Sequence, residues 1–147
     1  MANSTPAPSA VLFVCYLNSI RSPMAEGLMK KRFGNQTYVQ SCGMSSGEID
    51  DLMVAVMNEK GIDMSNHKSR TLADLGDTSF DVIIAFTQDA GDAAKAYFED
   101  TDTIIEVWPT PDPTAGTLDV RSMMNNYRSV RDYIDGRLER RFHEKTA

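Results

Sequence analysis

A thiol, a guanidinium and a hydroxyl stand close together near the start of the chain. Five residues separate Cys15 from Arg21, and Ser22 and Pro23 follow directly. A cysteine thiolate is a strong nucleophile, and a planar guanidinium can bind two oxygens of one phosphoryl group. This spacing predicts a site that holds a phosphate group and attacks it, with Cys15 as the nucleophile and Arg21 as the main phosphate ligand.

The residues between Cys15 and Arg21 are expected to form a loop around the bound anion. The apolar run over residues 10–14 predicts a strand that leads into Cys15, and Pro23 suits the first turn of a helix that Ser22 caps. Unpaired N–H groups at the start of a helix bind anions and favour a thiolate over a thiol. Phosphate contacts are therefore predicted from consecutive residues of this segment: Tyr16, Leu17, Asn18, Ser19, Ile20, Arg21 and Ser22.

The Ser22 hydroxyl is also a candidate donor to the Cys15 sulfur, which would help the sulfur to leave when a phosphorylated intermediate is hydrolysed. An isolated cysteine at the end of a strand is otherwise a small buried apolar residue. That alternative leaves the offsets of Arg21 and Pro23 from Cys15 unexplained, so a nucleophilic thiol is the favoured interpretation.

A second chemical group is expected from a proline-rich segment farther along the chain. Residues 108–116 hold three prolines and a glycine, which predicts a rigid, exposed loop after the last predicted strand. Cleavage of a phosphate ester is faster when an acid protonates the leaving oxygen. Asp112 is the candidate for this role, although an aspartate before a proline also suits an ordinary turn.

Short apolar runs alternate with segments of helical period, which predicts an α/β fold of three layers, a four-stranded parallel sheet flanked by helices. The predicted strands cover residues 10–15, 38–42, 81–86 and 103–107. The predicted helices follow Ser22 and cover residues 49–57, 89–98 and 120–138, with Gly61 placed to end the second of the four. Ligands bind at the carboxyl ends of parallel strands, so Cys15 and Asp112 are expected at the same edge of the sheet.

The length of 147 residues predicts one domain over residues 10–147, preceded by a disordered tail over residues 1–9. That tail lacks the basic and apolar pattern of a secretory signal, and no apolar run approaches the roughly 20 residues that span a bilayer. Two cysteines fit a reducing compartment. We therefore expect a cytoplasmic protein that does not bind membranes.

Charge and composition also narrow the partners. A net charge of −6 argues against a general nucleic-acid binder, because that function needs a basic face. Two cysteines and two histidines are too scattered to hold zinc. The expected chemistry needs neither a metal nor an organic cofactor.

Together these residues resemble the low-molecular-weight protein-tyrosine phosphatases, whose loop reads Cys-x5-Arg-Ser-Pro and whose general acid is the Asp of an Asp-Pro pair near the C-terminus. The resemblance extends over nearly the whole chain and includes Met24-Ala25-Glu26, Ser41, Gly43, the segment 61–65 with His67 and Arg70, and the segment 81–84. It implies hydrolysis of phosphate monoesters, phosphotyrosine in proteins among them, through a cysteinyl-phosphate intermediate. The substrates it implies are phosphorylated proteins or small phosphate esters, and the expected assembly is a monomer or a weak homodimer.

The resemblance also implies how the loop keeps its shape. In that family the loop asparagine, here Asn18, has a left-handed backbone conformation that hydrogen bonds from a serine and a histidine maintain. Asparagine tolerates a positive φ, so this role suits the residue. Ser22, Ser41 and His67 occupy the matching positions and are expected to support the loop from behind.

Two loop residues depart from the family pattern. Leu17 replaces the usual glycine and adds bulk that can narrow the loop, and Ile20 replaces a second cysteine that can protect the nucleophile through a disulfide. Oxidation of Cys15 is then expected to proceed to a sulfenic acid or beyond, unless Cys42 reaches it. Neighbouring strand residues point to opposite faces, so Cys42 should point away from the loop if Ser41 faces it.

The aromatic residues that usually surround phosphotyrosine are also missing. The segment 45–47 is Ser-Ser-Gly, and Thr114 and Ala115 follow the Asp112-Pro113 pair where tyrosines are common in the family. Tyr16 is the remaining candidate for one wall of the site. These differences leave the preference for phosphotyrosine open.

Two other functions are considered beside the phosphatase. Thioredoxin-linked arsenate reductases share this fold and loop, but their disulfide cascade needs two further cysteines, and residues 86–98 contain none. A reductase that uses an external thiol escapes this objection. A non-catalytic sensor that binds phosphate without turnover is the other alternative, suggested by Leu17 and the altered walls.

Overall fold

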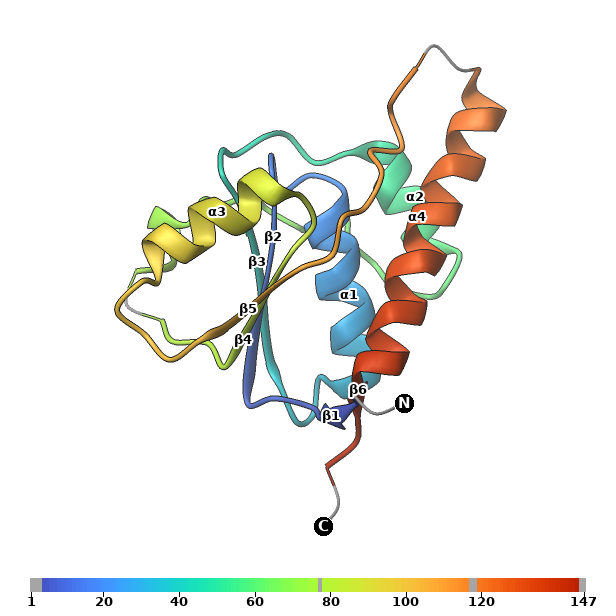
Figure 1. The fold of residues 1–147 in the computed structure, drawn as a ribbon. Coiled ribbons are helices and arrows are strands. Elements are labelled where there is room, and N and C mark those ends of the chain that lie inside the picture. The colour runs from blue at the N-terminus through green and yellow to red at the C-terminus, as the bar shows by residue number, and fades with distance from the viewer. Residues whose placement is uncertain (1–3, 77, 117–118, 146–147) are drawn as a thin grey trace.

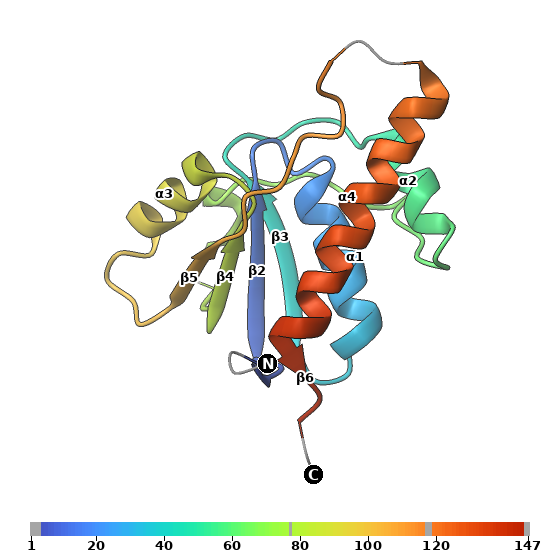
Figure 2. The same cartoon turned by 45° about the vertical axis from the view of Figure 1, so that its right-hand side comes forward.

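The computed structural model describes residues 4–76, 78–116 and 119–145. Its central sheet has four parallel strands in the order β3-β2-β4-β5: β2 (Ala10–Cys15), β3 (Tyr38–Gly43), β4 (Val82–Ala85) and β5 (Ile104–Val107). Helix α3 (Gln88–Tyr97) covers one face of the sheet, while α1 (Arg21–Phe33), α2 (Asp51–Asn58) and α4 (Val120–Arg141) lie on the other side (Figures 1 and 2). A short 3-10 helix, η1 (Ala73–Leu75), lies between α2 and β4. The predicted α/β class and the parallel sheet are confirmed.

The two faces of β2 pack into two separate hydrophobic cores. Val11 and Phe13 belong to the core under α1, α2 and α4, whereas Leu12 and Val14 belong to the core under α3. All four side chains are completely buried, and burial of a large apolar side chain contributes about 1.5–3 kcal/mol. Strand β2 is therefore held rigidly from both sides, and it ends at Cys15.

The start of α1 differs from the sequence-based prediction. Helix α1 begins at Arg21, and its N-cap residue Ile20 makes no side-chain cap. Ser22 lies inside the first turn, and its hydroxyl contacts Cys15 and Asn18 instead. The prediction that Ser22 caps the helix is wrong, because the loop already engages this hydroxyl.

The N-terminal segment is also better ordered than predicted. Strand β1 (Thr5–Pro6) pairs in parallel with β6 (Phe142–His143) at the end of α4, and Ala7 is buried. The N–H group of Ala7 donates to the carbonyl of His143 at 2.8 Å. A disordered tail over residues 4–9 is therefore wrong, because the C-terminal strand gives its main chain hydrogen-bond partners, and residues 1–3 lie outside the described residues.

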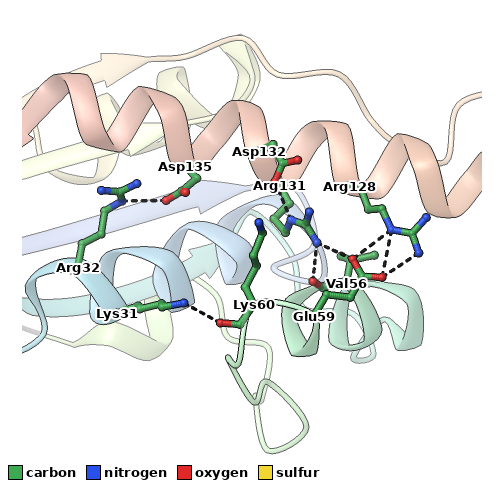
Figure 3. Close-up of polar contacts among 9 residues, drawn as sticks. All are labelled: Lys31, Arg32, Val56, Glu59, Lys60, Arg128, Arg131, Asp132 and Asp135. Atoms are coloured by element: carbon green, nitrogen blue, oxygen red, sulfur yellow. Dashed lines mark hydrogen bonds and ion pairs between the residues drawn. The ribbon is translucent and has the colours of Figure 1, made fainter.

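Helix α2 is fastened to α4 by a group of ion pairs (Figure 3). Arg131 is almost fully buried; one Nη donates to the carbonyl of Val56 and to a Glu59 carboxylate oxygen, each at 2.8 Å. Arg128 donates to the same carboxylate at 2.8 Å. Hydrogen bonds from Arg128 and Arg131 lower the pKa of Glu59 to about 2. This contact holds the C-terminal end of α2 against α4.

No helix within the described ranges combines the length and the apolar character needed to cross a membrane.

Candidate active site

The carbonyl groups of the loop after β2 accept hydrogen bonds from the segment that follows β3. The carbonyls of Cys15, Tyr16 and Leu17 accept hydrogen bonds from the main-chain N–H groups of Met44, Ser45 and Gly47, at 3.1, 2.9 and 3.0 Å. None of the N–H groups of residues 16–20 donates to another described residue. The carbonyls are thus engaged by the protein, while a run of consecutive main-chain donors has no protein acceptor among the described residues, a feature typical of loops that bind phosphate.

Asn18 holds the middle of this loop. Its φ of 57° makes it the one non-glycine residue with a positive φ in the described chain, and it is completely buried. Its carbonyl accepts hydrogen bonds from His67 Nε2 at 3.1 Å and from Ser69 Oγ at 2.9 Å. A carbonyl only accepts, so Nε2 carries the proton of the His67 ring.

The Asn18 side chain is also fully engaged. Its Nδ2 donates to Ser22 Oγ at 2.8 Å and to Ser41 Oγ at 2.9 Å, while Oδ1 accepts from the N–H group of Arg70 at 3.0 Å. Ser22 Oγ lies 2.9 Å from the sulfur of Cys15. The structure therefore brings Asn18, Ser22, Ser41 and His67 together behind the nucleophile, in the arrangement that the resemblance implies.

Strand β3 approaches this loop so closely that one position requires glycine. A Cβ atom on Gly43 would lie 2.6 Å from the carbonyl oxygen of Tyr16 and 2.7 Å from the N atom of Asn18. These neighbours are main-chain atoms that cannot rotate away. Gly43 is thus needed for the close contact between the loop and β3.

Cys15, Arg21 and Asp112 line one pocket of about 420 Å³ at the carboxyl end of the sheet, where β2 and β5 both end (Figure 1). Arg21 donates from Nη1 to the carbonyl of Thr110 at 2.8 Å, which ties the Cys15 loop to the segment that carries Asp112. The loop residues Tyr16, Leu17, Ser19 and Ile20 line the same pocket. The volume lies within the range of small-molecule sites, about 300–1,000 Å³.

Asp112 is exposed and sits in a tight local turn. Its Oδ1 accepts from the N–H group of Thr114 at 2.8 Å and from the Thr114 hydroxyl at 2.6 Å. Partial burial raises the pKa of this carboxyl, but the two bonds from Thr114 and the charge of Arg21 outweigh that effect, and the net pKa is lowered. In the protein without a bound anion, Asp112 is therefore ionised at neutral pH.

The walls of the pocket differ from the aromatic walls expected of the family. Leu17 is 42% exposed and packs over Gly47, where a Cβ atom would lie 3.2 Å from the Leu17 Cβ. The bulky side chain thus lies on the rim beside Gly47. Tyr16 is 55% exposed and is the aromatic residue among those that line the pocket.

Cys42 lies on the opposite face of the sheet from Ser41. It is completely buried in the core under α3, as the alternation of strand residues predicted. Burial raises the pKa of the Cys42 thiol to about 12, and the neighbouring Cys15 adds to the effect. Cys42 is thus a protonated core thiol at neutral pH.

Several groups at the site gave no signal of their own in the sequence. Ser69, the Arg70 main chain and the Thr110 carbonyl all contact Asn18 or Arg21. Asp50 lines the pocket, caps α2 by accepting from Met53 at 2.9 Å and accepts the Tyr127 hydroxyl at 2.9 Å. Residues of these types in loops are common, and only an Asp at the start of the 49–57 helix pattern could have been recognised, as an N-cap.

Within the part of the chain that the structure describes, no three His, Cys, Asp or Glu side chains are grouped so that they could hold a metal ion.

The comparison with known proteins agrees with this geometry. The model of the low molecular weight phosphotyrosine protein phosphatase family matches residues 10–145. The chain belongs to this family. Its similarity covers the loop, the sheet and the Asp112 segment alike, so the resemblance stated from the sequence is confirmed.

The chain is also similar to proteins that are named arsenate reductases. The chain is 33% identical over 129 residues to a glutaredoxin arsenate reductase of Synechocystis, covering 88% of this chain and 92% of that protein. It is 30% identical to an arsenate reductase of Bacillus subtilis, covering 88% and 91%. The chain is therefore similar to arsenate reductases as well as to the phosphatases that name the family.

Solved structures give the same picture. A structure of an arsenate reductase in the phosphate binding state matches with a TM-score of 0.75 and 30% identity, covering 89% of this chain and 94% of that one. The tyrosine phosphatase AmsI of Erwinia amylovora matches with a TM-score of 0.74 and 19% identity, covering 90% of each chain. The second match shows the shared fold alone.

Proposed function

We propose that the protein hydrolyses phosphate monoesters through a cysteinyl-phosphate intermediate on Cys15. One observation carries the proposal: Cys15, Arg21 and Asp112 line a single pocket, together with a loop whose N–H groups over residues 16–20 donate to no other described residue. The proposed substrates are phosphotyrosine in proteins and small aryl phosphates, with Tyr16 as one wall for the aromatic ring.

In the first step the Cys15 thiolate attacks phosphorus and the bond from phosphorus to the leaving oxygen breaks. Arg21 and the N–H groups of residues 16–20 bind the remaining phosphoryl oxygens, whose charge shifts in the transition state. Protonated Asp112 gives its proton to the leaving oxygen, so that a neutral alcohol or phenol departs.

In the second step a water molecule attacks the cysteinyl phosphate. Asp112, now ionised, takes a proton from that water, the phosphorus–sulfur bond breaks, and the electron pair returns to the sulfur. The Ser22 hydroxyl, 2.9 Å from Sγ, stabilises the departing thiolate by donating a hydrogen bond.

The lowered pKa of Asp112 affects the first step, in which this carboxyl must be protonated. At neutral pH the carboxyl is ionised in the protein alone, yet the first step needs it protonated. A bound phosphate brings negative charge beside the carboxyl and engages Arg21, and both effects raise the pKa of an acid. Asp112 is thus expected to take up a proton with the substrate.

A second candidate is arsenate reduction with an external thiol, and the arsenate reductase relatives favour it. Arsenate is a tetrahedral oxyanion that the same loop can bind. Its reduction to arsenite oxidises two thiols; Cys15 can supply one, and a small thiol or a thiol protein must supply the other. Cys42 is a poor second thiol, because it lies on the far face of the sheet.

The test compares both reactions in one protein. We expect release of phosphate from p-nitrophenyl phosphate and from a phosphotyrosine peptide, loss of turnover in Cys15→Ser, and normal turnover in Cys42→Ser, the matched control. A chelator should not change the rate. Arsenite formation with glutathione or glutaredoxin but no phosphate release would favour the reductase, and phosphate binding without either reaction would favour the sensor.

A further inference from the structure

A chain of hydrogen bonds runs from the nucleophile through the interior to the surface of α1. It passes from Cys15 through Ser22, Asn18 and Ser41 to Glu26. Ser41 Oγ donates to Glu26 Oε1 at 2.5 Å, and the other carboxylate oxygen accepts from Lys30 at 2.7 Å. Glu26 is 9% exposed, so this carboxylate ends a largely buried chain.

The carboxylate determines the direction of each bond in the chain. An ionised carboxylate only accepts, so the Ser41 proton is committed to Glu26 and the Ser41 oxygen accepts from Asn18. The Asn18 amide therefore turns its NH₂ group toward both serines. Its second N–H donates to Ser22, which occupies a lone pair of that hydroxyl and leaves the Ser22 proton for another acceptor.

Two acceptors are within reach of the Ser22 proton. Cys15 Sγ lies at 2.9 Å and the carbonyl of Cys42 at 3.3 Å. A hydrogen bond to an ionised acceptor is roughly twice as strong as one between neutral groups. The proton therefore points to the sulfur whenever Cys15 is a thiolate.

The opposite orientation of the Asn18 amide would break the chain at two points. It would turn NH₂ toward the N–H group of Arg70, which now donates to Oδ1 at 3.0 Å, and it would turn Oδ1 toward the oxygens of Ser22 and Ser41. With Glu26 holding the Ser41 proton, Ser41 cannot adapt by donating. The Arg70 main chain and Glu26 thus hold the same amide from opposite ends.

We propose that Glu26 is a positioning residue for the Cys15 thiolate: by fixing the Ser41 and Asn18 hydrogen bonds, it leaves the Ser22 hydroxyl to donate to the sulfur. This inference rests on the proposed role of Cys15 as a nucleophile. It assigns no contact between Glu26 and the substrate.

The hydrogen-bond chain and the charge of Glu26 have opposite effects on the Cys15 thiolate, so an experiment can distinguish them. The negative charge of Glu26 by itself disfavours a second negative charge on Cys15, so neutralising it would favour the thiolate. The hydrogen-bond chain acts in the other direction. Glu26→Ala removes both the charge and the acceptor, whereas Glu26→Gln removes the charge and keeps an oxygen that accepts from Ser41.

The test measures how fast iodoacetamide alkylates Cys15 as a function of pH, because the thiolate is the form that reacts. Mass spectrometry follows the Cys15 and Cys42 peptides separately. Cys15 is 3% exposed but lines the pocket, whereas Cys42 is completely buried in the core under α3 and serves as the internal control. We expect Glu26→Ala to move the midpoint of the Cys15 profile up by about one pH unit, a tenfold loss of thiolate at any pH well below the midpoint. Glu26→Gln should leave the midpoint unchanged or slightly lower.

Two controls remove a charge without touching the chain of acceptors. Lys30→Met removes the exposed partner of Glu26, and Glu59→Gln neutralises a carboxylate in the α2–α4 contact (Figure 3). Glu59→Gln should leave the midpoint unchanged, and Lys30→Met, which removes a positive charge beside Glu26, should raise it by much less than Glu26→Ala does. A Glu26→Ala profile that coincides with that of the parent protein, or moves down as charge alone requires, would overturn the proposal.

Ser41 gives a second route if Glu26→Ala folds poorly. Ser41→Ala cuts the same chain one step closer to Asn18 and should also raise the midpoint. Because both residues act through one chain, the double variant should shift no further than the larger single variant. Additive shifts would contradict the proposal. Alkylation does not depend on turnover, so a protein with the expected shifts but no phosphate release would disprove the proposed function and leave this inference standing.

Discussion

The two halves of the candidate site are built in opposite ways. The loop of residues 15–22 is enclosed by β3 and the segment 67–70, and its central residue, Asn18, is completely buried with every polar atom of its side chain engaged. Asp112 is exposed, and the partner of its carboxylate is a neighbour two residues away. One half is preformed by tertiary contacts, and the other is a local turn.

This difference matches what each half has to do. An anion-binding loop stabilises a transition state best when its donors need no rearrangement. An acid that must gain and lose a proton in each cycle benefits from a position that water can reach. Arg21 links the halves, because its side chain lines the pocket beside Cys15 and donates to the Thr110 carbonyl.

The largest effect on catalysis is expected from Arg21, which contacts both halves of the site. Arg21→Lys keeps the positive charge but removes the planar pair of donors. It also removes Nη1, which donates to the Thr110 carbonyl. We expect kcat/KM for p-nitrophenyl phosphate to fall by about 10²–10³-fold, similar to the loss of one transition-state donor. A loss below tenfold would show that the main-chain donors alone bind the phosphoryl group.

Replacement of the acid should separate chemistry from binding. Asp112→Asn removes the proton donor but leaves the loop of residues 15–22 intact, so inhibition by inorganic phosphate should stay within about twofold while turnover falls by about 10²-fold or more. The loss should be greater for a poor leaving group, such as phenol, than for p-nitrophenol. Equal losses for both would remove Asp112 from the role of acid.

The free energy of unfolding should depend more on the buried loop than on the exposed Asp112. Asn18→Ala leaves buried donors and acceptors without partners and should lower the free energy of unfolding by about 2–4 kcal/mol, measured with urea. Asp112→Ala, at an exposed position, should change it by no more than about 0.5 kcal/mol. If the two variants lose the same stability, the contrast between a preformed half and a local half fails.

The smallest effect is expected from the contact between α2 and α4, outside both halves. Glu59 has an ordinary pKa of 4.5 and a pKa of about 2 in the folded protein. Because the pKa is lowered on folding, its contribution to stability is complete above about pH 4.5 and is lost as the pH falls toward 2. The stability difference between the parent protein and Glu59→Gln should therefore shrink over this range, and a constant difference would contradict the ion pairs.

Much of the fold was predictable because its signals are local. The strands over residues 10–15, 38–42, 81–86 and 103–107 were found within two residues of their observed ends. All but the second contain a short apolar run between polar segments. The N-terminal segment was missed because its signal lies elsewhere. Thr5 and Pro6 are ordinary tail residues until the end of α4 supplies a strand for them to pair with.

The sequence by itself determined the chemistry of one continuous stretch: a strand that ends in Cys15, a short loop that carries Arg21, and a helix that follows. These parts are neighbours in the chain, so local geometry alone places the thiol beside the helix start and the guanidinium. The tertiary structure decided the rest. The polar groups that surround the loop come from four separate segments: Glu26, Ser41, residues 67–70 and residues 110–112. The packing of parallel strands, driven by burial of both sheet faces, brings these groups into the hydrogen-bond network of the loop or to its pocket.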